Sequence, residues 1–267
     1  MVHRRAVPPG TEIQAVRSAS AVRRVHRSGD RAKPAGVTPV SPADLAARIA
    51  ARHRLGETLV VGITGSVAVG KTTLARQIAE ALPADLKVEI VSTDGFLKPN
   101  AVLEAEGLSM RKGFPESYDR VAMAAALAGL KHGAVTVPAY SHTSYDVDPA
   151  AARTISGADV VLVEGLGLAP DASGQRPPLD LLIYIDAAED DIIAWFLARF
   201  MGLWEAAAND SSSFYARFRH MSEDEARQFA LSVWNGINRP NWLEHIALAK
   251  PVADLVVTKA LDHSLSV

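Results

Sequence analysis

The 267-residue sequence contains no cysteine, so disulfides and thiolate metal sites are excluded, and a reducing cytoplasm fits. It has no apolar run approaching the ~18 residues of a membrane span, and no signal-peptide hydrophobic region is found. The formal net charge is −2, and no compact basic pattern is visible in the body of the chain. These absences predict a cytoplasmic protein with neither a membrane nor a nucleic acid as partner.

The N-terminal stretch differs in composition from the rest of the chain. Residues 1–40 hold few aromatic or bulky apolar side chains to offset the entropy lost on ordering, and their Arg and Lys residues are opposed only by Glu12 and Asp30. We predict a disordered basic tail over residues 1–40. Two functional interpretations of this basic composition are a tether to an anionic surface and a transit-like segment. A solvated tail or an incorrectly assigned start is the simpler explanation. Residues 41–267 are expected to form a single domain, since 48% apolar residues are ample for a core.

A glycine-rich motif lies between the apolar run 59–64 and the helical pattern 74–82. A strand, a glycine-rich turn and a helix in that order are the context of a Walker A loop. Glycines let successive N–H groups point inward, and the helix N-terminus adds the positive end of its dipole. We expect Lys71 to contact the β/γ-phosphates and the Thr72 hydroxyl to ligate Mg²⁺. The predicted ATP-binding residues are Gly65, Ser66, Val67, Ala68, Val69, Gly70, Lys71, Thr72 and Thr73.

Apolar strands alternate with helical patterns after this motif. Ser41 is a predicted N-cap, the polar segment 97–119 is interpreted as an active-site excursion, and the run 254–258 is expected to be the last strand. This alternation predicts an α/β fold of the P-loop NTPase type, three-layer αβα with a mostly parallel sheet. In such folds ligands gather at the carboxyl ends of strands, where Thr64, Asp94 and Glu164 are predicted to lie.

Two carboxylates suggest phosphoryl transfer to an alcohol. Asp94 follows a strand and precedes a glycine, so it could act as the base that accepts the hydroxyl proton. Glu164 follows a buried-type strand in the manner of a Walker B carboxylate and could hold Mg²⁺ through water. A turn aspartate and a structurally capped glutamate are the simpler alternatives.

A series of motifs in unbroken order, from about residue 59 to the C-terminus, resembles bacterial type I pantothenate kinase, a P-loop kinase family. These motifs lie at residues 65–73, 92–96 with 99–100, 111–119, 138–146, 164–166, 198–200 and 234–238 with 241. The resemblance implies ATP and Mg²⁺ as cofactors, pantothenate as acceptor at its terminal hydroxyl, and the first step of coenzyme A synthesis. It also implies a homodimer and feedback inhibition by coenzyme A.

The resemblance further implies residue roles. Asp94 would be the base and Lys71 the phosphate clamp, while Arg76 and His142 would contact inhibitory coenzyme A. The implied pantothenate pocket comprises Tyr140, His142, Tyr145, Phe196, Arg199 and Asn238. Simpler interpretations are a loop histidine, a surface arginine and a helix C-cap for His142, Arg199 and Asn238.

The sequence departs from the family at two positions of the implied site. Phe196 replaces a tyrosine and Gly167 replaces an asparagine, and a lost buried hydrogen bond costs about 1–3 kcal/mol when its partner stays unsatisfied. The acceptor could therefore be another small alcohol, such as uridine or a phosphoribulose-like sugar. A non-catalytic sensor of ATP or coenzyme A is a further alternative, although a pure binder has no need of Asp94 as a base.

Overall fold

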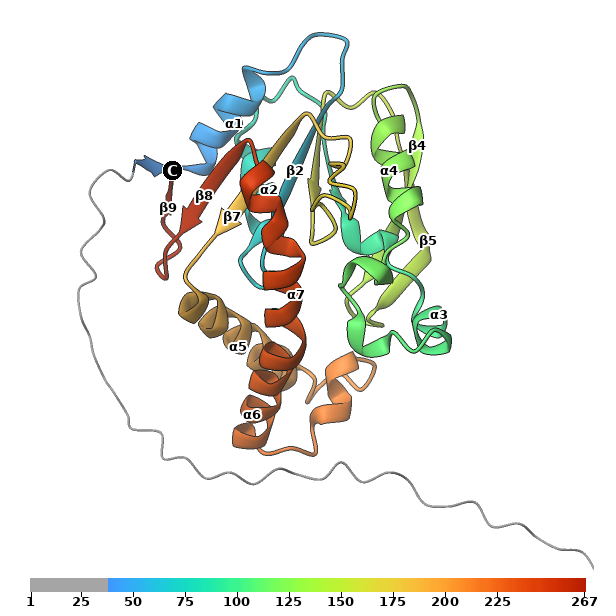
Figure 1. The fold of residues 1–267 in the computed structure, drawn as a ribbon, viewed down its shortest axis with the longest axis vertical. Helices are drawn as coiled ribbons and strands as arrows, with labels where there is room; N and C mark the ends of the chain where they lie inside the picture. Colours follow the sequence, from blue (N-terminus) through green and yellow to red (C-terminus); the bar gives the residue numbers. More distant parts are fainter. Residues whose placement is uncertain (1–37) are drawn as a thin grey trace, which may run out of the picture. The chain divides into compact units, whose positions relative to one another are not determined.

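The computed structural model describes residues 38–267, and Figure 1 traces the path of that part of the chain. Most of the predicted tail lies outside the described residues. The first described elements are the short strand β1, Pro39–Val40, and the helix α1, Pro42–Ala50. Ser41 caps α1 as predicted, because its side chain accepts a hydrogen bond from Asp44 N while the Asp44 carboxylate accepts one from Ser41 N at 2.8 Å.

Seven strands form one sheet in the order β1-β9-β8-β7-β2-β6-β3. The strands from β8 to β3 pair in parallel, whereas β9 pairs antiparallel with both β8 and β1. The bounds are Leu59–Gly65 for β2, Val88–Ser92 for β3, Val160–Glu164 for β6, Leu181–Asp186 for β7, Leu255–Lys259 for β8 and Leu265–Ser266 for β9. The predicted mostly parallel sheet is confirmed. The expectation that residues 254–258 form the last strand is wrong, because β9 follows, and two residues are too few to show an alternating pattern.

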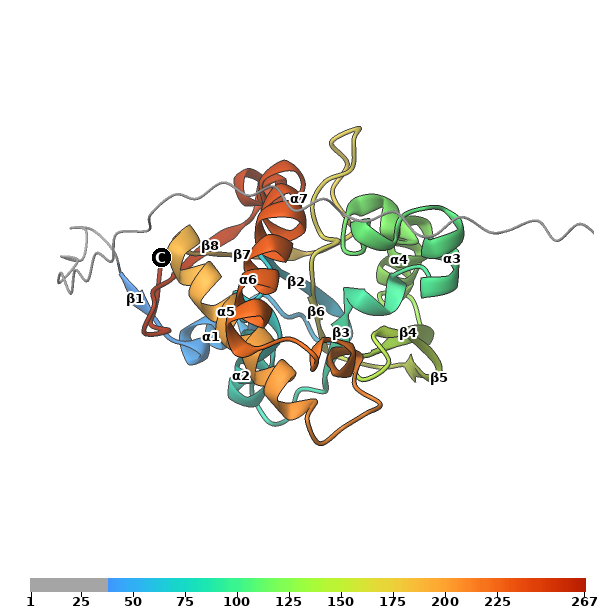
Figure 2. The same cartoon turned by 90° about the horizontal axis from the view of Figure 1, so that it is seen from below.

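Helices cover both faces of this sheet, as Figure 2 shows: α1 and α2, Lys71–Ala81, lie on one side, and α4, Arg120–Gly129, and α7, Arg239–Glu244, on the other. Successive residues of a strand point to opposite faces of the sheet. Val61 packs in the core that includes α1 and α2, whereas its neighbour Val60 packs in the core that includes α4. The predicted three-layer αβα architecture is confirmed.

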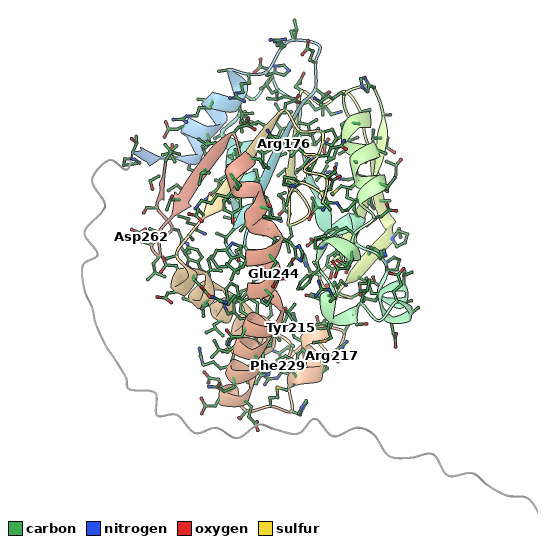
Figure 3. All side chains as sticks on the ribbon, in the orientation of Figure 1. Arg176, Tyr215, Arg217, Phe229, Glu244 and Asp262 are labelled. Atoms are coloured by element: carbon green, nitrogen blue, oxygen red, sulfur yellow. The ribbon has the colours of Figure 1, made fainter. Side chains whose placement is uncertain are left out.

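Below the sheet in Figure 1, α5, Glu189–Ala206, packs on α6, Glu223–Val233. The packing here is largely aromatic: the Phe200 ring of α5 lies 6.0 Å from Phe229 of α6 and 5.5 Å from Tyr215 of the intervening 3-10 helix Phe214–Phe218, and Figure 3 places these two partners together at this end. The next turn after α6, Trp234–Asn238, is a π-helix that leads into α7. Single π turns of this kind are frequent at functional sites.

The segment between β3 and β6 forms a side structure that was only partly predicted. The helix α3, Asn100–Ala105, lies in the supposed excursion, and β4, Val135–Ser141, pairs with β5, Asp146–Ile155, as a separate two-stranded sheet. Figure 1 shows this hairpin with α3 and α4 beside the main sheet. The strand β5 escaped prediction because most of its residues are exposed and small, so no apolar alternation marks it.

Candidate active site

Residues 65–70 form a tight loop between β2 and α2. Gly65 and Gly70 have φ values of +147° and +99°, and Ala68 is left-handed at +62°. A Cβ on Gly65 would come within 2.5 Å of the Ile185 backbone oxygen, so only glycine allows this close approach to β7. Ser66 and Val69 are buried, Val67 and Ala68 are half-buried, and Thr72 and Thr73 are exposed on the first turn of α2. The loop and the helix N-terminus together form an anion-binding cradle.

The Lys71 side chain folds back over this loop. Its Nζ donates hydrogen bonds to the backbone oxygens of Ser66 at 2.9 Å and Gly65 at 3.3 Å. Burial lowers the pKa of the Lys71 ammonium to about 8, although the negative charges of Glu164 and Asp94 favour its charged form. A polyphosphate would supply further negative charge beside this desolvated cation, so the site favours a phosphorylated ligand.

Glu164 and Thr72 are the residues that could hold a divalent cation. Glu164 ends β6 between β2 and β3 and is only 6% exposed, and its carboxylate makes no hydrogen bond or ion pair within the described residues. Residues 38–267 contain no group of three or more His, Asp or Glu side chains suited to a metal ion. A cation here would therefore take most of its ligands from phosphate and water, as Mg²⁺ commonly does. The donor set fits that mode of binding.

Asp94 lies half-buried in the 3-10 turn Thr93–Phe96, directly after β3. The Tyr118 hydroxyl donates a hydrogen bond of 3.4 Å to Asp94 Oδ1. Burial, followed by the Asp94 charge, raises the pKa of Tyr118 well above its ordinary value, so the phenol stays protonated and remains a donor. The carboxylate is thereby held at the same sheet edge as Lys71 and Glu164.

Two glycines bring the carboxylate turns close to their neighbours. A Cβ on Gly95 would overlap the backbone oxygen of Pro138 in β4, which sets the β4–β5 hairpin directly against the Asp94 turn. A Cβ on Gly165 would overlap Thr93 Oγ1, so the ends of β6 and β3 meet without a side chain between them. Gly165 therefore lets the end of β6, which carries Glu164, approach the turn that carries Asp94, and Gly95 lets the β4–β5 hairpin approach the same turn.

We expect Gly165→Ala to lower the free energy of unfolding by roughly 2–4 kcal/mol, because φ is +150° and the added methyl meets Thr93. Chemical denaturation measures the loss. Gly167→Ala is the matched control, since its Cβ would sit at an ordinary 3.4 Å from Met123 Cε. Equal stability of the two variants would contradict the packing argument.

The predicted pocket residues of the hairpin gather at its turn. The Tyr140 ring lies edge-on to His142 at 5.2 Å and to Tyr145 at 6.0 Å, and Tyr145 stacks on Phe214 at 4.3 Å. Burial raises the pKa of Tyr145 to about 12, so its hydroxyl is neutral at physiological pH. His142 is exposed. These rings form an aromatic wall next to the Asp94 turn.

The remaining predicted pocket residues come from α5 and the π-helix. Arg199 is exposed, and its positive charge opposes the burial-driven rise in the pKa of both Tyr145 and Tyr215. Asn238 ends the π-helix and is half-buried. Phe196 packs against Trp234 at 5.8 Å and Phe200 at 6.4 Å, within the aromatic contact of α5 and α6. Arg76 is exposed on α2, in the turn that follows Lys71.

Several residues at this edge were missed from the sequence. Lys259 Nζ donates to the Val69 backbone oxygen at 2.9 Å and lies 4.4 Å from the centre of the Trp195 ring. Lys112 and Tyr118 come from the segment 97–119 and lie in the family-like motif 111–119, but neither was assigned a role. Each acts through contacts with residues far away in sequence, and no spacing rule reports such contacts. For Lys112 and Tyr118 the available signals were the polar character of this segment and the resemblance of residues 111–119 to the family motif.

A family model described as phosphoribulokinase / uridine kinase matches residues 60–202. The pantothenate kinase of Streptomyces avermitilis is 42% identical over 79% of this chain and 68% of its own length. The pantothenate kinase of Rhizobium etli is 43% identical over 76% of this chain and 66% of its own length. The chain thus spans about two thirds of the length of these curated relatives.

A solved structure from Silicibacter, described as a candidate fructose transport system kinase, has the same fold. It superimposes with a TM-score of 0.64 at 24% identity and covers 81% of this chain and 98% of its own. The structural likeness supports the P-loop kinase fold alone, whereas the sequence matches identify the family. The chain belongs to the phosphoribulokinase and uridine kinase family of P-loop kinases and, within it, to the pantothenate kinases.

Proposed function

We propose that the protein transfers the γ-phosphate of ATP to the terminal hydroxyl of pantothenate. One observation carries the reaction type: the half-buried Lys71 side chain, Asp94 and Glu164 lie at one edge of the sheet, where the aromatic hairpin meets the Asp94 turn. The names of the relatives supply the acceptor. The aromatic wall of the hairpin, with the positive charges of Lys112 and Arg199 beside it, suits a small alcohol that carries an anionic group and is held next to a base.

In this reaction the acceptor oxygen forms a bond to the γ-phosphorus while the bond from that phosphorus to the β,γ-bridging oxygen breaks. Asp94 takes the hydroxyl proton, and Lys71 stabilises negative charge on the phosphates. Mg²⁺, held by Thr72 and through water by Glu164, would neutralise phosphate charge when bound. Tyr118 keeps the Asp94 carboxylate oriented through its hydrogen bond.

The finer assignments belong to the same proposal. Tyr140, His142, Tyr145, Phe196, Arg199 and Asn238 bind the acceptor. Arg76 and His142 contact coenzyme A as an inhibitor; both side chains are exposed, so a bulky ligand can reach them. The active form is a cytoplasmic homodimer. Among residues 38–267 there is no helix with the length and hydrophobicity of a membrane span.

The test is ADP release by the purified protein with Mg·ATP and a panel of alcohols: pantothenate, uridine, ribulose 5-phosphate and glycerate. Turnover of pantothenate with the highest kcat/KM supports the proposal. Good turnover of another alcohol with none of pantothenate would replace the acceptor and keep the kinase. ATP binding without turnover of any alcohol would favour a sensor.

Phe196→Tyr tests the pocket at its departure from the family. Phe196 lies beside Trp234, whose buried Nε1 has no hydrogen-bond partner among the described residues. If the pocket takes pantothenate, the added hydroxyl should lower the KM for pantothenate by up to about tenfold, one hydrogen bond's worth, with little change in kcat. The measurement is steady-state kinetics at saturating ATP.

Phe229→Tyr, which adds a hydroxyl to the same aromatic cluster from α6, should leave that KM unchanged. A raised KM for pantothenate in Phe196→Tyr would indicate that the added hydroxyl makes no hydrogen bond to this acceptor and obstructs it, and that the pocket is shaped for another alcohol.

A further inference from the structure

The turn between β4 and β5 contains a strained residue. Tyr145 has a φ of +57°, the left-handed conformation that an aromatic residue rarely adopts and that costs of order 1–3 kcal/mol. Tyr145 also stacks on Phe214 and faces Tyr140 edge-on, so its backbone conformation decides where the aromatic wall points. Something outside the turn must hold it in place.

Two side chains from the segment 97–119 do so. Asn100 Nδ2 donates a hydrogen bond of 3.0 Å to the Tyr145 backbone oxygen, and Lys112 Nζ donates one of 2.6 Å to the same oxygen. Lys112 Nζ also donates to Asn100 Oδ1 at 2.6 Å, which closes a triangle of bonds. The backbone N of Asn100 donates to Asp146 Oδ1 at 2.9 Å, so the residue after Tyr145 is held as well.

The Lys112 ammonium also orients the two rings. It lies 4.7 Å from the centre of the Tyr145 ring and 5.1 Å from that of Tyr140, within the range of cation–π attraction. Burial lowers the pKa of Lys112, while Asp146 and Asp94 favour its charged form. A half-buried ammonium that is hydrogen-bonded to two oxygens and lies over two rings has little conformational freedom, so it holds the groups that it contacts in place.

We propose that Asn100 and Lys112 form a clamp that holds the Tyr145 turn in its strained, acceptor-binding conformation. They are positioning residues: the excursion 97–119 controls acceptor binding through the backbone of the hairpin. The proposal rests on the proposed function in one respect, since it takes the hairpin as the acceptor wall. The clamp itself is a property of the folded chain and can be measured without any substrate.

The experiment compares Asn100→Ala and Lys112→Met with the full-length parent. Lys98→Met is the matched control, because it removes an ammonium from the same segment that is paired only with the exposed Glu106 at 2.7 Å. Amide hydrogen exchange over residues 141–146 is measured on the substrate-free protein. We expect exchange there to be about five- to tenfold faster in each clamp variant, the worth of one lost hydrogen bond, and unchanged in Lys98→Met.

Kinetics supply the second readout. Each clamp variant should raise the KM for the acceptor by about tenfold with the KM for ATP within about twofold of the parent. In the double variant the loss of acceptor binding, expressed as a free energy from the rise in KM, should be smaller than the sum of the losses in the two single variants. Both donors act on the same carbonyl oxygen, so their effects are not independent. If Asn100→Ala fails to fold, Lys112→Met alone decides the outcome.

Unchanged exchange over residues 141–146 in a folded clamp variant would overturn the clamp, whatever the acceptor is. If the parent itself does not phosphorylate pantothenate, the proposed function fails, and the exchange measurement still tests the clamp. Equal rises in the KM for ATP and for the acceptor would also count against it, since they would indicate a general loss of structure.

Discussion

Asp94→Asn is expected to lower kcat by about 10²–10⁴, the usual worth of a positioned general base, while ATP binding stays within about threefold of the parent. The amide is nearly isosteric with the carboxylate and can still accept the hydrogen bond from Tyr118. It cannot take the proton from the acceptor hydroxyl. The loss should therefore fall on the chemical step, and single-turnover kinetics at saturating ATP and acceptor measure it.

Asp85→Asn is the control for the change of one charge, because Asp85 is exposed on the loop between α2 and β3. It should leave kcat unchanged. An Asp94→Asn variant within threefold of the parent would remove Asp94 from the role of base and return it to that of a turn residue before Gly95.

The phosphate loop could be predicted from the sequence because its geometry is local. The positive φ values at Gly65 and Gly70 and the start of α2 at Lys71 all follow from nine consecutive residues. The placement of Asp94 and Glu164 could be predicted for a related reason. Parallel strands end at a common edge, so two acids that follow apolar runs are expected to meet there.

The acceptor side of the site was harder to predict, because its conformation is held by contacts between segments that are distant in sequence. The Tyr145 turn depends on Asn100 and Lys112, which lie 45 and 33 residues away in sequence. Similarly, Tyr118 reaches Asp94 across 24 residues. The strand β5 and the π-helix Trp234–Asn238 also lack a periodic signal, since the first is mostly exposed and the second continues the pattern of α6. Family resemblance pointed to these residues where the physical pattern alone did not.

Lys71→Met should lower kcat/KM by about 10³ or more, because it removes the cation that faces the phosphates both in the bound state and as charge develops during transfer. The fold should remain intact. Burial depresses the pKa of Lys71 to about 8, so the charged ammonium is less favourable in the folded chain than in the unfolded one, and its removal does not cost the fold a stabilising charge.

The same pKa predicts a pH dependence for the parent protein. Below about pH 8 the Lys71 ammonium is charged before ATP binds, whereas above it the free protein must take up a proton on binding the polyanion. The affinity for ATP should therefore fall as the pH rises through 8. Calorimetry in two buffers of different ionisation enthalpy measures this proton uptake near pH 8.5, and Lys71→Met should lack it. Proton uptake that persists in Lys71→Met would assign the titration to another group, of which Lys259, also with a lowered pKa beside the loop, is the first to test.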